Sequence, residues 1–249
     1  LFSEIPEGTN KIGFGEDQDS HFRARHIQYK STSTLFELEY PDGVIEINSP
    51  MIGRFNVQNV LASLAVGWVE GFNVFEMASQ LSYFKGSPGR LENVNEGQKF
   101  SVFVDYAHTS DALRNILSVL REVTDGRLLL VFGCGGDRDH KKRPLMTSAA
   151  QEYCDYVWAT ADNPRSEPLD SIFTHMKDGV QLPDHIKFVK DRRRAISLAI
   201  EDAKPNDCLI IAGKGHETYQ EVNNTIIAFD DRRVTRELLH IKSNFNGSQ

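Results

Sequence analysis

The chain has 249 residues, 40% of them hydrophobic, which is enough to bury one large core or two smaller ones. Lysine and arginine number 28 against 35 aspartates and glutamates, and the net charge of -7 argues against a general nucleic-acid binder. No apolar run approaches the roughly 18 residues that a membrane span needs, and the chain does not open with a signal-peptide pattern. We therefore expect a soluble protein that binds neither membranes nor nucleic acid.

The three cysteines are an odd number without metal-like spacing, and each lies in or beside an apolar stretch: Cys134, Cys154 and Cys208. This usage is typical of reduced core thiols in a cytoplasmic protein. A nucleophilic role for Cys134 would need a neighbouring base and a lowered pKa. A small packing residue is the favoured interpretation.

The first 87 residues combine short β-prone runs with two helical patterns. The runs cover residues 11–14, 22–29, 33–40 and 44–47, and turn residues such as Pro41-Asp42-Gly43 separate them. This is the pattern of antiparallel hairpins. The first helical pattern repeats apolar residues at three- and four-residue spacing: Val57, Val60, Leu61, Leu64 and Trp68. The second runs from 74 to 83, with Met77, Leu81 and Phe84 on its apolar face.

Proline and glycine interrupt both patterns at Gly86-Ser87-Pro88-Gly89. We predict a hinge there, and a boundary between domains at 1–87 and 88–249.

Beyond the hinge, strand and helix patterns alternate. The strand candidates are 101–105, 128–132, 156–160, 186–189 and 209–212, with a weaker run at 225–229. Helices fall between them, and Ser110 and Asp191 are candidate N-caps. Alternation of this kind predicts an α/β fold with a mostly parallel sheet and helices on both faces.

The segment 128–146, LLLVFGCGGDRDHKKRPLM, reads as a buried strand followed by a glycine-rich turn and a helix start. Pro144 suits the first turn of that helix, so Arg138 and Arg143 would lie where open α/β sheets bind ligands. A tight strand-to-helix connection with solvated charges is the alternative. Arg143 could face a phosphate, whereas the run Arg192-Arg193-Arg194 is expected to be a solvated helix surface.

Four predicted strands end in loops that carry charge. These loops read DYAH at 105–108, GCGGDRD at 133–139, DNPR at 162–165 and GKGHE at 213–217. Because parallel strands end at one edge of a sheet, we expect the four loops to form a single site.

Six motifs occur in order along the chain: GRFNVQN at 53–59, PGRLE at 88–92, VDYAHT at 104–109, FGCGGDRD at 132–139, DNPR at 162–165 and GKGHE at 213–217. Together they closely resemble the Mur ligase family, in particular its members that add 2,6-diaminopimelate in peptidoglycan synthesis. Each motif alone is weak to moderate. Six in the same order make a chance match negligible.

The resemblance implies a three-domain amide ligase that depends on ATP and Mg²⁺. ATP would phosphorylate the carboxylate of UDP-N-acetylmuramoyl-L-Ala-D-Glu, and the amino group of meso-diaminopimelate would attack the acyl phosphate. Residues 1–87 would then be the trailing part of the α/β central ATP-binding domain, with short antiparallel strands. Residues 88–249 would be the Rossmann-like C-terminal domain that binds the incoming amino acid.

The family's phosphate-binding loop, expected to read GTNGKT, is absent. Gly8-Thr9-Asn10-Lys11 imitates it but lacks the glycine spacing and the following Ser or Thr. The lysine and glutamate that the family uses for Mg²⁺ would also lie upstream, and the chain opens on Leu1. We therefore expect a truncated chain, inactive by itself, with no catalytic residue or metal ligand of its own.

The resemblance assigns the binding residues by position. For meso-diaminopimelate they are Arg138, Asp162, Asn163, Arg165, Gly213 and Glu217, and for ATP they are Asn59, Arg90, Asp105 and His108. The chemistry agrees, because a substrate that is zwitterionic at both ends needs cationic donors and at least one anion. The guanidinium of Arg165 could hold a carboxylate through two parallel hydrogen bonds.

Several alternatives remain open at this point. A lysine-adding Mur ligase would lack a distal carboxylate for Arg165, and a folylpolyglutamate synthase fits DNPR and GKGHE poorly. A non-catalytic binding module and an unrelated nucleotide-binding α/β domain belong to other classes. The resemblance implies a monomer acting on small molecules, and the role of Asp230 to Arg233 is not readable from the sequence.

Overall fold

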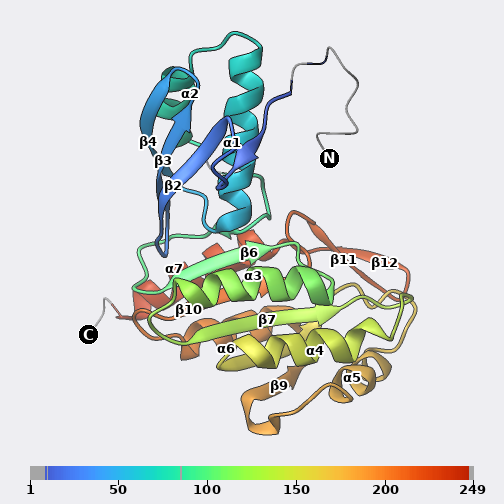
Figure 1. Cartoon of the computed structure of the whole chain (residues 1–249). Coiled ribbons are helices and arrows are strands. Elements are labelled where there is room, and N and C mark those ends of the chain that lie inside the picture. The colour runs from blue at the N-terminus through green and yellow to red at the C-terminus, as the bar shows by residue number, and fades with distance from the viewer. Residues whose placement is uncertain (1–8, 10, 85, 247–249) are drawn as a thin grey trace. The chain divides into compact units, whose positions relative to one another are not determined.

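A computed structural model describes residues 9, 11–84 and 86–246 of the chain. The chain divides into two compact units, residues 1–85 and 86–249, coloured blue to teal and green to red in Figure 1. The predicted boundary at residue 87 lies two positions from this division. Gly8 and Asn10 of the segment that imitates a phosphate loop lie outside the described residues.

The first unit contains a four-stranded sheet in the order β1-β2-β3-β4. Its strands are β1 (Phe14–Gly15), β2 (Phe22–Tyr29), β3 (Thr34–Tyr40) and β4 (Gly43–Ser49). The pairs β2–β3 and β3–β4 are antiparallel, which confirms the predicted hairpins. The prediction was wrong for β1, which pairs parallel to β2. A strand of two residues is too short to show a period of two.

Two helices pack on this sheet, α1 (Arg54–Val69) and α2 (Val74–Leu81). Asn73 begins α2 as its N-cap, and its side chain accepts a hydrogen bond from the backbone N–H of Glu76. The apolar face predicted for the first helix is buried against the strands, with Leu61 fully inaccessible. Burial of this face stabilises the unit.

The second unit contains a six-stranded sheet in the order β5-β6-β10-β7-β8-β9. The strands are β5 (Glu92–Asn93), β6 (Ser101–Asp105), β7 (Leu128–Cys134), β8 (Tyr156–Ala161), β9 (Ile186–Val189) and β10 (Cys208–Ala212). All pairs are parallel except β5–β6, which confirms the predicted mostly parallel sheet. Every residue of β7 is buried, as expected for a central strand covered on both faces.

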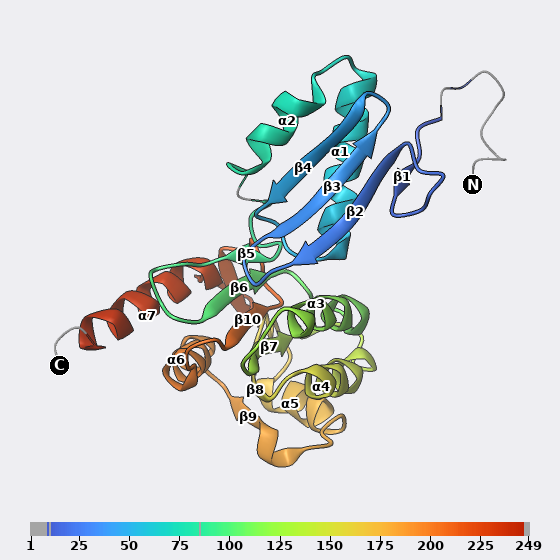
Figure 2. The ribbon, with the colours of Figure 1, turned by 60° about the vertical axis from the view of Figure 1, so that its left-hand side comes forward.

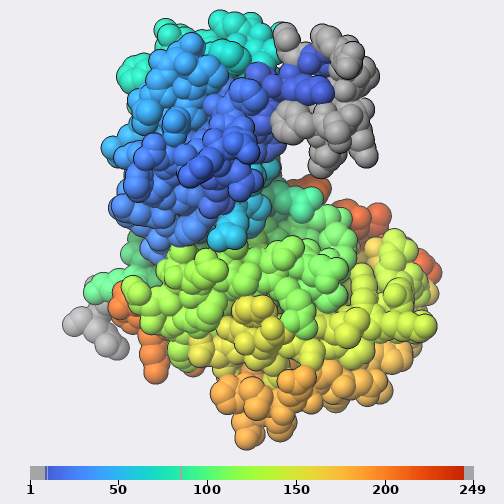
Figure 3. Space-filling view, in the orientation of Figure 1, coloured from blue at the N-terminus to red at the C-terminus, as the bar shows by residue number. Residues whose placement is uncertain are grey.

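Helices cover both faces of this sheet. They are α3 (Ser110–Glu122), α4 (Lys142–Tyr153), α5 (Leu169–Lys177), α6 (Arg192–Asp202) and α7 (Asp231–Asn246), with a 3₁₀ turn at Pro183–His185. Figure 2 shows α3, α4 and α5 on one side and α6 and α7 on the other. In the space-filling view, α3 and α4 form much of the surface that this unit turns to the viewer (Figure 3). The order of layers is therefore helix, sheet, helix.

The helix caps test two predictions. Asp191 caps α6 and accepts from the backbone N–H of Arg194, as expected. The cap of α3 is Thr109, whose hydroxyl accepts from Ala112, and Ser110 is the first helical residue. The neighbouring hydroxyl thus replaces the predicted one.

A separate hairpin follows the main sheet. The weak run at 225–229 becomes β12 (Thr225–Ala228), which pairs antiparallel with β11 (Tyr219–Val222). The hairpin therefore stands outside the parallel sheet (Figure 1).

Two arginines expected at the surface are buried. Arg143 is 0% exposed and donates to both carboxylate oxygens of Glu167, so it does not face a phosphate. Arg192 is 2% exposed and pairs with Asp231, whereas Arg193 and Arg194 are exposed as predicted. A long charged side chain can be buried when a carboxylate is built to meet it.

The cysteines are buried thiols, as predicted. Burial raises the pKa of Cys134 to about 12, and its thiol lies 3.8 Å from the sulfur of Met146. Packing is thus the role of Cys134. In the part of the chain that the structure describes, no helix is both long and apolar enough to cross a membrane.

Candidate active site

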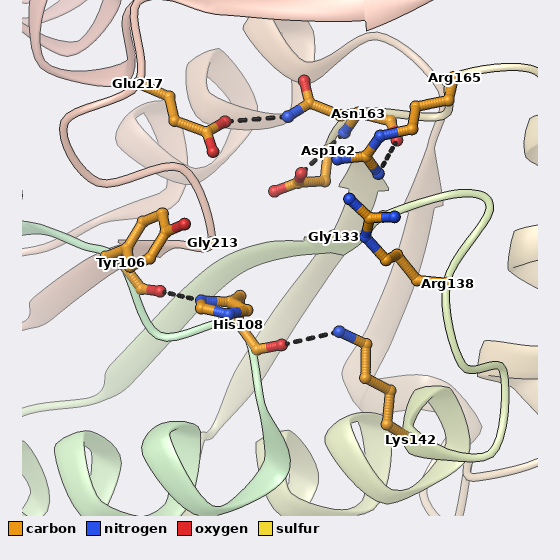
Figure 4. Close-up of a pocket in the computed structure, with 11 residues that line it drawn as sticks. Tyr106, His108, Gly133, Arg138, Lys142, Asp162, Asn163, Arg165, Gly213 and Glu217 are labelled. Carbon is orange, nitrogen blue, oxygen red and sulfur yellow. Dashed lines mark hydrogen bonds between the residues drawn. The ribbon is translucent and has the colours of Figure 1, made fainter.

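A pocket of about 240 Å³ lies at the carboxyl ends of four neighbouring strands, β6, β10, β7 and β8. Its lining comes from the four charged loops predicted to meet there (Figure 4). The lining residues are Tyr106, His108, Gly133, Gly135, Arg138, Lys142, Asp162, Asn163, Arg165, Gly213 and Glu217. The structure thus brings together all six residues assigned to the amino acid, together with His108.

Two glycines allow the loops to approach one another. Gly213 has φ 116°, and a Cβ there would lie 2.6 Å from Oδ2 of Asp162. A Cβ at Gly136 would lie 1.9 Å from the carbonyl oxygen of Pro164. Any larger residue at these positions would separate the loops that line the pocket.

Asp162 presents an unsatisfied acceptor to the pocket. Its Oδ1 accepts from the backbone N–H of Asn163 at 2.7 Å, whereas its Oδ2 is buried without a hydrogen-bond partner among the described residues. A buried carboxylate oxygen left unpaired is costly. A ligand that donates a hydrogen bond, such as an ammonium, would satisfy it.

Glu217 offers a second carboxylate oxygen. Its Oε2 accepts from Nδ2 of Asn163 at 2.9 Å and from Nζ of the buried Lys214 at 3.1 Å. Its Oε1 accepts no hydrogen bond from the described residues. Together, Oε1 of Glu217 and Oδ2 of Asp162 form an acceptor pair suited to an ammonium group.

Arg165 is held in place from several sides. Its backbone has φ 54° and pairs with β11, donating to the carbonyl of Glu221 and accepting from the N–H of Asn223. Its Nη1 donates to the carbonyls of Gly136 and Asn163, and its Nε lies 3.4 Å from Oε2 of Glu221. Among the described residues nothing accepts from Nη2, whereas Nη1 and Nε are engaged, so a ligand carboxylate would meet one nitrogen and not the expected two-nitrogen fork.

Two further cations line the pocket. Arg138 donates to the carbonyl of Asp137, and Lys142 donates to the carbonyl of His108 at 3.3 Å. Neither forms an ion pair with any residue that the structure describes. Both charges are therefore available to an anionic ligand. Nδ1 of His108 donates to the carbonyl of Tyr106 at 2.8 Å, since a carbonyl only accepts.

An aromatic and cationic surface lies beside this pocket. The guanidinium of Arg90 stacks 4.8 Å from the ring centroid of Tyr106, which also contacts the rings of His108 and His216. Asp105 is committed elsewhere, because its two oxygens accept from the backbone N–H groups of Leu91 and Ala107. Burial raises the pKa of Asp105 despite these hydrogen bonds.

Asn59, the fourth residue assigned to ATP, lies on α1 in the first unit. Its Nδ2 donates to Oδ1 of Asn56 at 3.3 Å. It is not one of the residues that line the pocket.

Two family models match the chain. The Mur ligase glutamate ligase domain matches residues 89–215, and the Mur ligase middle domain matches residues 3–67. The chain belongs to the Mur ligase family.

Two curated relatives of this chain have the same name. The UDP-N-acetylmuramoyl-L-alanyl-D-glutamate–2,6-diaminopimelate ligase of Solibacter usitatus is 44% identical over 93% of this chain and 47% of its own length. The ligase of the same name from Syntrophomonas wolfei is 42% identical over 92% of the chain and 47% of its length. The chain thus spans about half the length of the curated relatives it matches.

Solved Mur ligase structures are similar as well. A structure of a UDP-N-acetylmuramoyl-L-alanyl-D-glutamate–2,6-diaminopimelate ligase aligns with a TM-score of 0.72 and 37% identity, covering 91% of this chain and 47% of that one. The UDP-N-acetylmuramate-alanine ligase MurC of Thermotoga maritima aligns with a TM-score of 0.67 at 18% identity, covering 94% and 48%. The second likeness shows the fold alone.

Several residues around this Mur ligase pocket were missed by the sequence analysis. Tyr106 and Lys214 stand inside the quoted motifs and Lys142 within the segment 128–146, but a position in a motif does not show which way a side chain points. No sequence pattern indicated a role for Glu167, because that role depends on Arg143, 24 positions away. Its hydrogen bonds with Arg143 lower the pKa of Glu167 to about 2, and it also accepts from the backbone N–H of Asp137. Glu167 thereby braces the glycine-rich loop against the DNPR loop.

Proposed function

We propose that this chain is the C-terminal portion of an ATP-dependent ligase that joins meso-diaminopimelate to UDP-N-acetylmuramoyl-L-Ala-D-Glu in peptidoglycan synthesis. The names of the relatives support the reaction, and the pocket supports the amino acid. On this proposal residues 88–249 bind the amino acid, and residues 1–87 complete the central ATP-binding domain. The whole enzyme would act as a cytoplasmic monomer on small molecules.

The observation that carries the proposal is the set of uncommitted charges in one pocket. Among the described residues, Oδ2 of Asp162 and Oε1 of Glu217 are acceptors without partners, and Arg138 and Nη2 of Arg165 are donors that meet no carboxylate. meso-Diaminopimelate carries an ammonium and a carboxylate at each end. The carboxylates would meet the arginines and an ammonium would meet the two acids, while the second amino group would be the nucleophile.

ATP would supply the phosphoryl group that activates the acceptor carboxylate. The residues of this chain that fit it are Arg90, whose guanidinium lies on Tyr106, and His108 with Lys142 at the edge of the pocket. Asp105 would act indirectly by shaping the backbone at Leu91 and Ala107, since its carboxylate is occupied. Asn59 is proposed as an adenine contact from the family motif GRFNVQN.

The described residues fit Mg²⁺ less well than they fit ATP. They contain no group of three His, Cys, Asp or Glu side chains arranged to hold a metal ion. We therefore assign no metal ligand among these residues and derive no step through the metal.

A lysine-adding ligase is the second candidate. L-Lysine has the second ammonium but no second carboxylate, so either Arg138 or Nη2 of Arg165 would meet no ligand carboxylate in the pocket. The similarity to a folylpolyglutamate synthase of Mycobacterium tuberculosis, with 24% identity and a TM-score of 0.59, supports a shared fold alone. Arg138 and the remaining Nη2 of Arg165 favour diaminopimelate.

The test is product formation by the protein at the full length of its relatives. With ATP, Mg²⁺, UDP-N-acetylmuramoyl-L-Ala-D-Glu and meso-diaminopimelate, we expect a tripeptide product whose mass equals the sum of the two substrates less one water. One ADP should appear for each product. Product formed only with L-lysine would transfer the proposal to the second candidate, and no product with either amino acid would reject both.

A further inference from the structure

A buried lysine lies directly behind two of the pocket residues. Lys214 is 0% exposed, and it is not one of the residues that line the pocket. Its Nζ donates to Oδ1 of Asn163 at 2.9 Å and to Oε2 of Glu217 at 3.1 Å. The same ammonium lies 5.5 Å from the ring centroid of Tyr219. A buried charge is tolerated only with such partners, so these contacts are strongly constrained.

Lys214 determines which way the side chain of Asn163 faces. A lysine ammonium can only donate, so the atom of Asn163 that meets it must be the carbonyl oxygen. The backbone N–H of Glu221 donates to the same oxygen at 3.1 Å. A flip of the carboxamide would place its amide nitrogen against two donors. The amide nitrogen of Asn163 is therefore fixed toward Glu217.

This orientation in turn fixes Glu217. Its Oε2 accepts from Asn163 (Figure 4) and from Lys214. Among the described residues, this leaves Oε1 as its uncommitted oxygen. The carboxylate of Asp162 lines the same pocket, so two acidic groups share the site.

We propose that Lys214 is a positioning residue for the incoming amino acid. It holds Asn163 in one orientation and Glu217 in one rotamer, so that the carboxylate is already aimed at the ammonium of the ligand. The inference rests on the proposed function for the identity of the ligand, but the positioning itself is a property of this chain. Lys214 acts through Asn163 and Glu217 and touches no substrate.

The test uses Lys214→Met, which keeps an unbranched stem and removes the charge and the donors. Lys242→Met is the matched control, because Lys242 donates to the carbonyls of Ile200 and Ala203 and is not a pocket residue. Should Lys214→Met fail to fold, Lys214→Gln is the second variant, because its amide nitrogen is uncharged and ends one bond short of the position of Nζ, so the same displacement and the same rise in KM are expected.

The first readout is a crystal structure of the 249-residue variant chain. We expect the carboxylate of Glu217 and the carboxamide of Asn163 to leave their present contact, while the Lys242→Met chain keeps it. The second readout is kinetics of the protein at the full length of its relatives. The KM for the amino acid should rise about tenfold or more, the worth of one charge-assisted hydrogen bond, with the KM for ATP unchanged.

Unmoved side chains in the Lys214 variant would overturn the inference, and so would moved side chains with an unchanged KM for the amino acid. A loss of the same size in Lys242→Met would show a general effect of stability and would also overturn it. If the wild-type protein joins no amino acid, the proposed function fails and the crystal structures alone decide the role of Lys214.

Discussion

Arg192 and Asp231, 39 positions apart, form an ion pair in which both side chains are 0% exposed. Nε of the arginine donates to Oδ1 at 2.8 Å, and Nη2 donates to Oδ2 at 2.7 Å. The same guanidinium donates to the carbonyls of Ala161 and Ala212, the last residues of β8 and β10. The pair thus joins α6 and α7 to the strand ends that carry Asp162 and Gly213.

Replacing one partner of this pair should destabilise the fold far more than replacing both partners. We expect Arg192→Met or Asp231→Leu alone to lower the free energy of unfolding by about 3–5 kcal/mol, because each leaves a buried charge without its partner. The double variant should be clearly more stable than the sum of the two losses predicts. Urea unfolding followed by Trp158 fluorescence, in a Trp68→Phe background, measures the second unit. Strictly additive losses would contradict the account.

The pair of Arg143 and Glu167 predicts a dependence of stability on pH. Its carboxylate has a pKa lowered to about 2, chiefly by hydrogen bonds from Arg143, against 4.5 ordinarily. A lowered pKa contributes stability that is present above the unfolded value and is lost as pH falls from about 4.5 toward 2. Near pH 6, the free energy of unfolding of wild type should exceed that of Glu167→Gln by about 2–3 kcal/mol. That difference should shrink by pH 3.

Urea unfolding at several pH values between 3 and 6 measures this difference. Glu201→Gln is the control, because the side chain of Glu201 is 56% exposed and its pair with Arg194 is on the surface. A difference between wild type and Glu167→Gln that stays constant with pH would count against the assigned pair.

The cysteines should be unreactive in the folded chain. Burial raises the pKa of Cys134 and of Cys208 to about 12, so the thiolate fraction at pH 8 is about one in ten thousand. We expect no labelling by a thiol reagent at pH 8 until the protein is unfolded, when all three should react. Rapid labelling of Cys134 in the native chain would show that its loop opens to solvent.

The sequence allowed the second sheet and its functional edge to be predicted, because both depend on local pattern. Strand-length apolar runs ended in charged loops, and parallel strands place such ends together. The order of the strands was not predictable in the same way. β10 lies between β6 and β7, so GKGHE lies between the DYAH and GCGGDRD loops, and no local pattern records that insertion.

The burial of Arg143 and Arg192 also depends on partners that are distant in the sequence. Arg143 and Arg192 look like surface charges in the sequence, and each is buried by a carboxylate more than 20 positions away. Strand β11 was missed because Tyr219–Val222 pairs with β12 and the DNPR loop and buries little apolar surface of its own. The positive φ of Arg165 likewise follows from that pairing and not from its own residue type.

The isolated 249-residue chain should neither hydrolyse ATP nor form the amide bond. The chain spans about half the length of its curated relatives, and the described residues include no metal-binding cluster. Coupled detection of ADP with all substrates present measures turnover, with the protein at the full length of its relatives as the positive control. Turnover by the purified 249-residue chain would contradict this prediction.

The central claim is that the pocket reads the distal carboxylate of meso-diaminopimelate through Arg165, and one ratio tests it most directly. The ratio is kcat/KM for meso-diaminopimelate over that for L-lysine, measured in full-length wild type, Arg165→Ala and the exposed control Arg233→Ala. Because Nη2 offers a charge-assisted hydrogen bond worth about 1.5–3 kcal/mol, the ratio should fall about ten- to a hundredfold in Arg165→Ala. It should stay unchanged in Arg233→Ala. Equal losses for both amino acids in Arg165→Ala would show that the arginine only braces its loop, and would contradict the claim.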